Sequence, residues 1–277
     1  PEADCTAEAP RLTISVARLE QLSPALLELG CPARVYIPLE EVSRLESLPG
    51  EGPEWCAVLP RVWRDRDEPA LRTLLERARA LGFTGVLIGN LGHLPLVRGL
   101  NFHLYGDYGL NVFNSRSLAY LKDKELESAC VSFELRFAQI RDLKKVLRAE
   151  AIVYGRLPLM ITENCLVQNE TGCRLDRQGP CVPEDGPCRC GQPNVLVDRT
   201  GAAFPLLPAY GHRTEIQNSK PLYLADRPEH RRLGLAYARL RFTTETAEEC
   251  VSVVQNYLDA APAAGDFTRG LYERGVE

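Results

Sequence analysis

The cysteines are the residues of this sequence whose spacing most directly suggests chemistry. Five of the ten cysteines fall between Asn164 and Cys190, in NCLVQNETGCRLDRQGPCVPEDGPCRC, a stretch with few apolar residues. A [4Fe–4S] cluster needs four thiolates, and tetrahedral zinc takes four thiolates or three with a histidine. The spacings C-x7-C, C-x7-C, C-x6-C and C-x-C lack the C-x2-C pairs of zinc ribbons and bacterial ferredoxins. The group of cysteines therefore predicts a metal site but does not identify the metal. The alternative is that these thiols bind no metal.

Composition favours this interpretation over a disulfide framework. Ten cysteines in 277 residues lie well below the ~8–10% typical of disulfide scaffolds. No secretory signal pattern opens the sequence, which favours a cytoplasmic protein with reduced thiols. No apolar run approaches the ~18 residues that cross a bilayer, so no membrane contact is expected. The net charge of −4 gives no overall attraction to nucleic acid, although a local basic groove would still allow RNA binding.

A second set of candidates consists of polar residues that follow predicted strands. A carboxylate near a guanidinium can orient a polar or anionic substrate, and Glu134 with Arg156 are the proposed catalytic pair. A salt bridge that closes the top of a barrel is the alternative for these two. Asn90, Asn111 and Asn114 are the candidate substrate-binding residues. The full set of strand-end residues is Glu40, Arg61, Asn90, Asn111, Asn114, Glu134 and Arg156.

Strands and helices alternate along the chain, and this order predicts how the candidates are positioned. Eight apolar runs predict strands at 11–16, 33–40, 55–62, 85–90, 102–114, 128–135, 150–160 and 234–242. Apolar residues at helical spacing predict helices at 19–29, 69–82, 136–147 and 246–260. Eight such units in about this length predict an α/β fold of the (β/α)8 TIM-like type, and an open doubly wound sheet is the alternative. In a barrel, the strand-end residues would meet at one mouth.

One long insert interrupts the alternation after the seventh strand. Residues 161–225 hold the cysteines and then VLVDRTGAAFPLLPAY, which predicts a β-hairpin turning at Arg199–Thr200–Gly201. Long inserts in compact domains are usually functional or disordered. No linker divides the chain, so residues 1–277 are expected to form a single barrel domain with the insert inside it.

Several motifs resemble the collagenase-like peptidase family U-32. They are GDYGLNVFNSRSLAYL (106–121), SFELRFAQI (132–140) and AIVYGRLPLMITENC (151–165), with DFTRGLYERG (266–275) near the end. The resemblance implies a barrel carrying a [4Fe–4S] cluster, and the expected ligands are Cys165, Cys173 and one or both of Cys188 and Cys190. Family members usually take one ligand from further downstream, and AYGHRTEIQNS offers His212 there in place of a cysteine. Three alternatives follow for this histidine: a ligand of iron at an altered potential, a ligand better suited to zinc, or the mark of a lost site. Cys181 lies in extra sequence and is the spare thiol.

The resemblance leaves three functional interpretations open. The first is an iron–sulfur-dependent, oxygen-independent hydroxylase or subunit acting on an RNA base or an aromatic precursor. The second is a peptidase, as the family name implies, although no H-E-x-x-H, G-x-S-x-G, P-loop or G-x-G-x-x-G motif is present. The third is a non-catalytic barrel that holds zinc and docks a partner. A missing N-terminal domain or partner subunit is expected in each case, because the chain resembles part of a longer family member.

Overall fold

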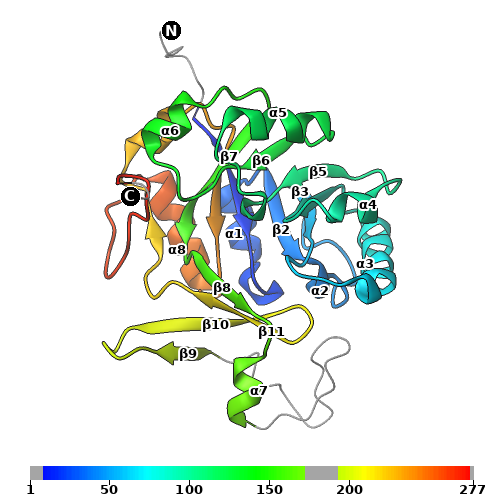
Figure 1. The fold of residues 1–277 in the computed structure, drawn as a ribbon. Helices are drawn as coiled ribbons and strands as arrows, with labels where there is room; N and C mark the ends of the chain where they lie inside the picture. The colour runs from blue at the N-terminus through cyan, green and yellow to red at the C-terminus, as the bar shows by residue number, and fades with distance from the viewer. Residues whose placement is uncertain (1–8, 172–192, 275–277) are drawn as a thin grey trace.

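The parallel sheet of this protein closes into an eight-stranded barrel. The computed structural model describes residues 9–171 and 193–274. Neighbouring strands pair in parallel, and the pairing of β6 with β7 and of β13 with β1 completes the circle. The barrel strands are β1 (Arg11–Ser15), β2 (Arg34–Pro38), β3 (Glu54–Val58), β4 (Gly85–Ile88), β5 (His103–Gly106), β6 (Ser128–Cys130), β7 (Arg148–Gly155) and β13 (Tyr237–Arg241). The predicted TIM-like barrel is confirmed (Figure 1).

Helices lie around the barrel, except α7 (Leu166–Thr171), which lies at the antiparallel sheet described below (Figure 1). They are α1 (Pro24–Gly30), α2 (Leu39–Val42), α3 (Glu68–Leu81), α4 (His93–Val97), α5 (Ser115–Asp123), α6 (Phe137–Asp142), α7 (Leu166–Thr171) and α8 (Ala247–Leu258), with 3-10 turns at Leu19–Gln21, Asp65–Asp67, Tyr108–Leu110 and Pro228–Arg232. α3 buries Leu71, Leu75 and Ala78 on one face and ends at Gly82, whose φ of 99° suits glycine. The Thr246 side chain accepts a hydrogen bond from the Glu249 N–H and begins α8. No helix in the described ranges is long and apolar enough to cross a bilayer.

A separate antiparallel sheet lies across one end of the barrel. Its strand order is β8-β11-β10-β9, from β8 (Pro158–Thr162), β9 (Asn194–Val197), β10 (Ala203–Ala209) and β11 (Arg213–Gln217). β9 and β10 form the predicted hairpin, in which Asp198 accepts the backbone N–H groups of Thr200 and Ala202. The short strand β12 (Leu222–Tyr223) returns the chain to β7 in antiparallel register. The sheet lies beyond the carboxyl ends of the barrel strands (Figure 1), where barrel enzymes build their sites.

Most predicted elements have somewhat different bounds in the structure, and the strand expected at 102–114, for example, ends at Gly106. The strand expected at 150–160 divides at Gly155 into β7 and β8, which belong to different sheets. Gly155 has a φ of 119°, and a Cβ there would lie 2.0 Å from the Arg241 carbonyl oxygen, so the chain turns where only glycine fits. The helix expected at 19–29 begins only after Ser23, which caps α1. The helix expected at 136–147 ends at Asp142 because Leu143 is extended.

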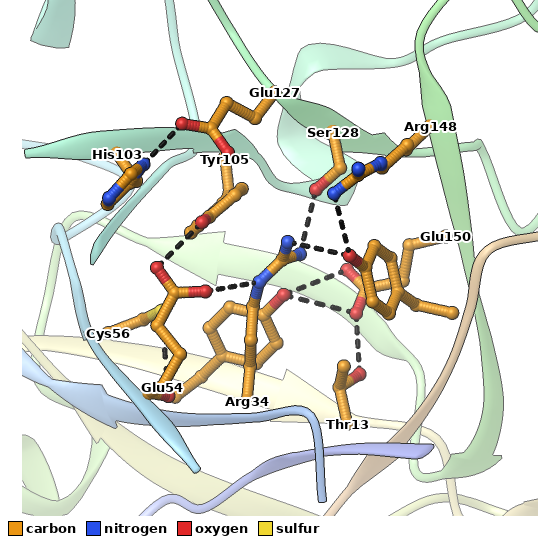
Figure 2. A network of polar contacts seen from close by, with 12 residues as sticks. Thr13, Arg34, Glu54, Cys56, His103, Tyr105, Glu127, Ser128, Arg148 and Glu150 are labelled. Carbon is orange, nitrogen blue, oxygen red and sulfur yellow. Dashed lines mark hydrogen bonds and ion pairs between the residues drawn. The ribbon is translucent and has the colours of Figure 1, made fainter. Parts of the chain in front are cut away.

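Polar side chains fill the amino-terminal end of the barrel interior. Arg34, at the start of β2, lies between the Tyr105 and Tyr237 rings, with its Cζ atom 3.6 and 4.1 Å from their centres. Its Nε atom donates to Glu54 at 2.9 Å and its Nη1 atom to the Ser128 hydroxyl at 2.9 Å (Figure 2). A second, apolar group of buried side chains lies further along the strands: Tyr36, Cys56, Leu87 and Tyr105. The interior is therefore a packed core on this side.

Candidate functional site

A cavity of about 390 Å³ lies between the barrel mouth and the antiparallel sheet. Barrel strands and the segments that follow them supply its floor and sides, while β8, β10, β11 and the start of β9 supply its roof. Val16, Leu59, Leu207 and Phe242 are among its apolar residues. Its charged lining residues are Arg18, Glu40, Arg61, Asp107, Arg213, Glu215, Arg239 and Arg241. Apolar walls with a few converging polar groups are typical of small-molecule sites.

Arg239 forms the charged part of the floor. It lies inside the barrel on β13 and is 1% exposed. Its Nη1 atom lies 2.5 Å from Asp107 Oδ1, and its Nη2 atom donates to Glu150 Oε2. Burial alone would lower the pKa of Arg239, but the carboxylates of Glu150 and Asp107 outweigh burial and raise that pKa well above its usual value. Arg239 is therefore a fixed cation at the bottom of the cavity.

Glu150 is itself held by donors from two other strands. The Thr13 hydroxyl donates to Glu150 Oε1 at 2.5 Å, and the Tyr36 hydroxyl donates to the same oxygen at 3.1 Å. Figure 2 shows the Thr13 side chain pointing at the Glu150 carboxylate inside the barrel. Because every member is buried, the network fixes the orientation of Arg239 before any ligand enters.

Glu215 connects the roof to the barrel. It lies on β11, and its Oε1 atom is 3.3 Å from Arg61 Nη1 and 3.3 Å from the Tyr108 hydroxyl. Its other oxygen is 3.3 Å from Arg241 Nη2. Burial, and then the neighbouring Glu215 carboxylate, raise the pKa of Tyr108, so this phenol stays protonated. The roof is further fixed by an ion pair between Arg213 and Glu163, with an Nε–Oε1 distance of 3.0 Å.

Two charged residues of the lining lack such pairing. Neither Arg18 nor Glu40 forms an ion pair with any residue in the described ranges. The Nε atom of Arg18 is buried and has no hydrogen-bond partner. Removal from bulk water raises the pKa of Glu40 to about 7, and the neighbouring Glu41 adds to this effect. A carboxyl with that pKa can give or take a proton near neutrality.

Of the predicted strand-end residues, the structure brings Glu40 and Arg61 to the cavity. Asn90 instead donates to the Arg61 carbonyl oxygen at 3.0 Å and contacts the ring of His93. Asn114 caps α5, where its side chain accepts the N–H groups of the second and third helical residues at 3.0 Å. Asn111 is exposed and left-handed, with a φ of 50°. The three asparagines thus have local structural roles or face solvent, outside the cavity lining.

The predicted pair of Glu134 and Arg156 also lies outside the lining. Arg156 Nη1 donates to the backbone oxygens of Asn218, at 3.1 Å, and Ser219, which anchors the loop before β12. Glu134 lies in a turn after β6, where its N–H is 3.4 Å from the Ser132 hydroxyl. No ion pair joins Glu134 to Arg156 in the part of the chain that the structure describes.

Two of the predicted metal ligands are described, and both lie at the same end of the β8–β11 ladder. In that ladder Thr214 pairs with Thr162, and the adjacent residues Arg213 and Glu163 form an ion pair. His212 and Cys165 lie just beyond them in the chain at this end of the ladder. Cys165 is buried, and its sulfur accepts the N–H of Gln168 at 3.3 Å. His212 Nε2 is buried without a hydrogen-bond partner. A bound ion would explain such an orphaned nitrogen, so His212 fits a ligand role, although the described residues alone do not bring three possible ligands together. Cys173, Cys181, Cys188 and Cys190 lie outside the described residues.

Sequence reasoning missed the groups that form the cavity floor. Arg239 and Arg241 alternate with apolar residues in YARLR of β13, so both face the barrel interior. This pattern, with charged residues at every second position of a strand expected to be buried, could have predicted that both arginines point into the barrel. Asp107 and Glu215 carried no comparable signal, because their partners come from distant strands.

The sequence itself decides the family. Residues 48–194, just over half of the chain, match the model of peptidase family U32. The chain belongs to peptidase family U32. No significant match to this U32 chain is found among curated proteins.

Three solved structures resemble the U32 chain in fold. The U32 peptidase Mk0906 is 10% identical, with a TM-score of 0.45 over 89% of this chain and 98% of that one. The ribulose-1,5-bisphosphate carboxylase/oxygenase of Pyrococcus horikoshii OT3 is 8% identical, with a TM-score of 0.41 over 92% of this chain and 59% of that one. The spore cortex-lytic enzyme SleL of Bacillus cereus is 7% identical, with a TM-score of 0.38 over 90% of this chain and 75% of that one.

Proposed function

We propose that this U32 chain is an oxygen-independent hydroxylase, or the substrate-binding subunit of one, that uses a [4Fe–4S] cluster. Its substrate would be an RNA base or a small aromatic precursor bound in the cavity at the barrel mouth. The proposed ligands are Cys165, Cys173, Cys188 and Cys190, with His212 as a further donor. A partner domain or subunit would complete the assembly.

One observation carries this proposal: the cysteine-rich segment is joined to the chain at the cavity wall on both sides. Ile161, four residues before Cys165, lines the cavity from β8. Pro193, Asn194 and Val195, which directly follow the segment, line it as well. Because the chain before and after the cysteines lines the pocket, this connection supports a role for a cysteine-held cofactor beside a bound substrate.

The described residues have separate tasks in such a reaction. A bound cluster would supply electron transfer. Arg239 and Arg241 would hold the polar edge of the substrate, and Leu59, Leu207 and other apolar residues would exclude water. Glu40, with its pKa of about 7, would hold or release a proton at the substrate.

Metal analysis after anaerobic purification tests the proposal. We expect a brown protein with about four iron atoms per chain, which Cys165→Ser removes or strongly reduces. Cys31→Ser is the matched control, because Cys31 is an exposed cysteine at the end of α1 and should leave the iron content unchanged. One zinc per chain without iron would favour the non-catalytic, zinc-holding alternative. Metal-free protein with freely titrating thiols would refute both.

A peptide hydrolase is the second candidate, and Glu40 is the observation that favours it. A carboxyl with a pKa of about 7 that lines a cavity has the properties of a general base for activating water. In that case, cleavage of a peptide library would survive Cys165→Ser and be lost in Glu40→Gln. Cleavage lost in neither variant would argue against this role for Glu40.

A further inference from the structure

Two arginines that line the cavity each have a buried guanidinium N–H donor without an acceptor. The Nε atoms of Arg18 and Arg239 are both buried without a hydrogen-bond partner, and both residues line the cavity. Arg239 lies on β13, and Arg18 follows the neighbouring strand β1. A buried charged donor without an acceptor is costly, and such groups in native proteins usually mark a place for an ion, a water or a ligand.

The charge balance around the cavity indicates what the acceptor is. Five arginines line the cavity, and four carboxylates pair with them: Asp107 and Glu150 with Arg239, Glu215 with Arg61 and Arg241, and Glu163 with Arg213. Arg18 forms no ion pair among the residues that the structure describes. Glu40 also lines the cavity, and burial raises its pKa to about 7, so near neutral pH it balances the charge of Arg18 only in part. A negatively charged acceptor would balance the remainder.

The pairing of Arg239 also leaves one particular N–H group without a partner. Asp107 and Glu150 occupy its two terminal nitrogens, so its Nε–H is the donor without a partner. Asp107 and Glu150 therefore act as positioning residues that hold the guanidinium in one orientation. A donor fixed in advance costs no reorganisation when a ligand binds.

We infer that the cavity binds an oxyanion, the carboxylate or phosphate group of a small ligand, through Arg18 and Arg239. The apolar side chains of Val16, Leu59 and Phe242 line the same cavity and would contact the uncharged body of that ligand. This inference deepens the proposed function, since it rests on the same cavity as the substrate pocket. It does not depend on whether iron is bound.

Calorimetric titration with three probes tests the inference on the purified chain. Benzoate carries a carboxylate on an apolar ring, benzamide has the same shape without the charge, and inorganic phosphate has the charge without the ring. We expect benzoate, phosphate or both to bind at least roughly tenfold more tightly than benzamide, because charge-assisted hydrogen bonds are about twice as strong as neutral ones. Binding of benzoate alone would identify a carboxylate, and binding of phosphate alone would identify a phosphate. Equal binding of benzamide and benzoate, or no binding of either anion, would overturn the inference.

Arg18→Gln is the deciding variant. Arg18 is partly exposed and has no ion pair among the described residues, so its loss should leave the fold intact while weakening the anion roughly tenfold or more. Arg116→Gln, on the exposed face of α5, is the matched control and should bind like the parent. Arg239→Lys, checked for folding by circular dichroism, should weaken the anion as well. An Arg18→Gln protein that binds as tightly as the Arg116→Gln protein would refute the assignment.

The two proposals fail in different ways. Anion binding by a chain that holds no iron would support the oxyanion site and count against the hydroxylase. An iron-containing chain that binds neither anion would support the hydroxylase and refute the oxyanion site.

Discussion

Replacing Glu150 with glutamine tests whether the barrel interior depends on the ion pair that holds Arg239. Glu150 is 1% exposed and accepts hydrogen bonds from Thr13, Tyr36 and Arg239. Glutamine keeps the shape of the side chain but removes the charge, so Arg239 retains only Asp107. Breaking a buried pair by removing one partner costs about 3–5 kcal/mol. For a chain somewhat longer than 250 residues, this corresponds to a fall in Tm on the order of 10 °C.

Urea unfolding followed by tryptophan fluorescence measures this loss in the free energy of unfolding. Glu127→Gln is the matched control, because Glu127 pairs with His103 at the surface, and exposed pairs contribute about 0–1 kcal/mol. A Glu150→Gln protein as stable as the Glu127→Gln protein would refute the view that the buried charge holds Arg239. An unchanged urea midpoint combined with a changed slope would also count against it, since the change would then lie in the denatured state.

Three further predictions concern single positions. Gly155→Ala should lower the free energy of unfolding by more than about 3 kcal/mol, since the added Cβ meets the Arg241 carbonyl oxygen. The control Gly201→Ala, at a φ of 86° in open space, should lower it by only about 1 kcal/mol. Similar urea midpoints for the two variants would be inconsistent with the close contact at Gly155. The pKa of Glu40 in the folded protein, about 7, is above its usual value of 4.5, so ionising this buried carboxyl lowers the free energy of unfolding increasingly from about pH 4.5 to pH 7. Glu40→Gln should therefore raise the Tm at pH 8 by an amount equivalent to roughly 1–3 kcal/mol and leave the Tm unchanged at pH 4. The same change in Tm at both pH values would count against the raised pKa. Asn114→Ala should lower stability by about 1 kcal/mol through loss of the α5 cap; ligand binding weakened at unchanged stability would instead support its predicted role in substrate binding.

The architecture was predictable from the sequence because buried strands and amphipathic helices have strong local patterns. The eight apolar runs that predict strands each overlap a barrel strand, and the hairpin at Arg199–Thr200–Gly201 follows from its turn residues. Element ends were less predictable. The division at Gly155 depends on the carbonyl oxygen of Arg241, nearly 90 residues away in sequence, so no local pattern announces it.

The candidate site was predictable only in part. The positions of Glu40 and Arg61 at the ends of predicted strands correctly predicted that both lie at the barrel mouth, because the carboxyl ends of those strands face the cavity. Asn114 had the same position in sequence but uses its side chain to cap the next helix. Glu215 could not be anticipated, since its place in the cavity depends on how the antiparallel sheet lies on the barrel. Sequence alone does not determine the packing of an insert against the domain that holds it.

The stack of Arg34 between two tyrosine rings has a consequence for ligand traffic. Together with the buried side chains of Tyr36, Cys56 and Leu87, it fills the barrel below the cavity in the part of the chain that the structure describes, as is usual for the packed interior of such barrels. Under the proposed function, substrate and product would then exchange through the same opening, between the barrel rim and its roof. A polymer could not thread through such a blind pocket. An RNA substrate would have to present a single unstacked base at the opening, and product would have to leave before the next substrate enters.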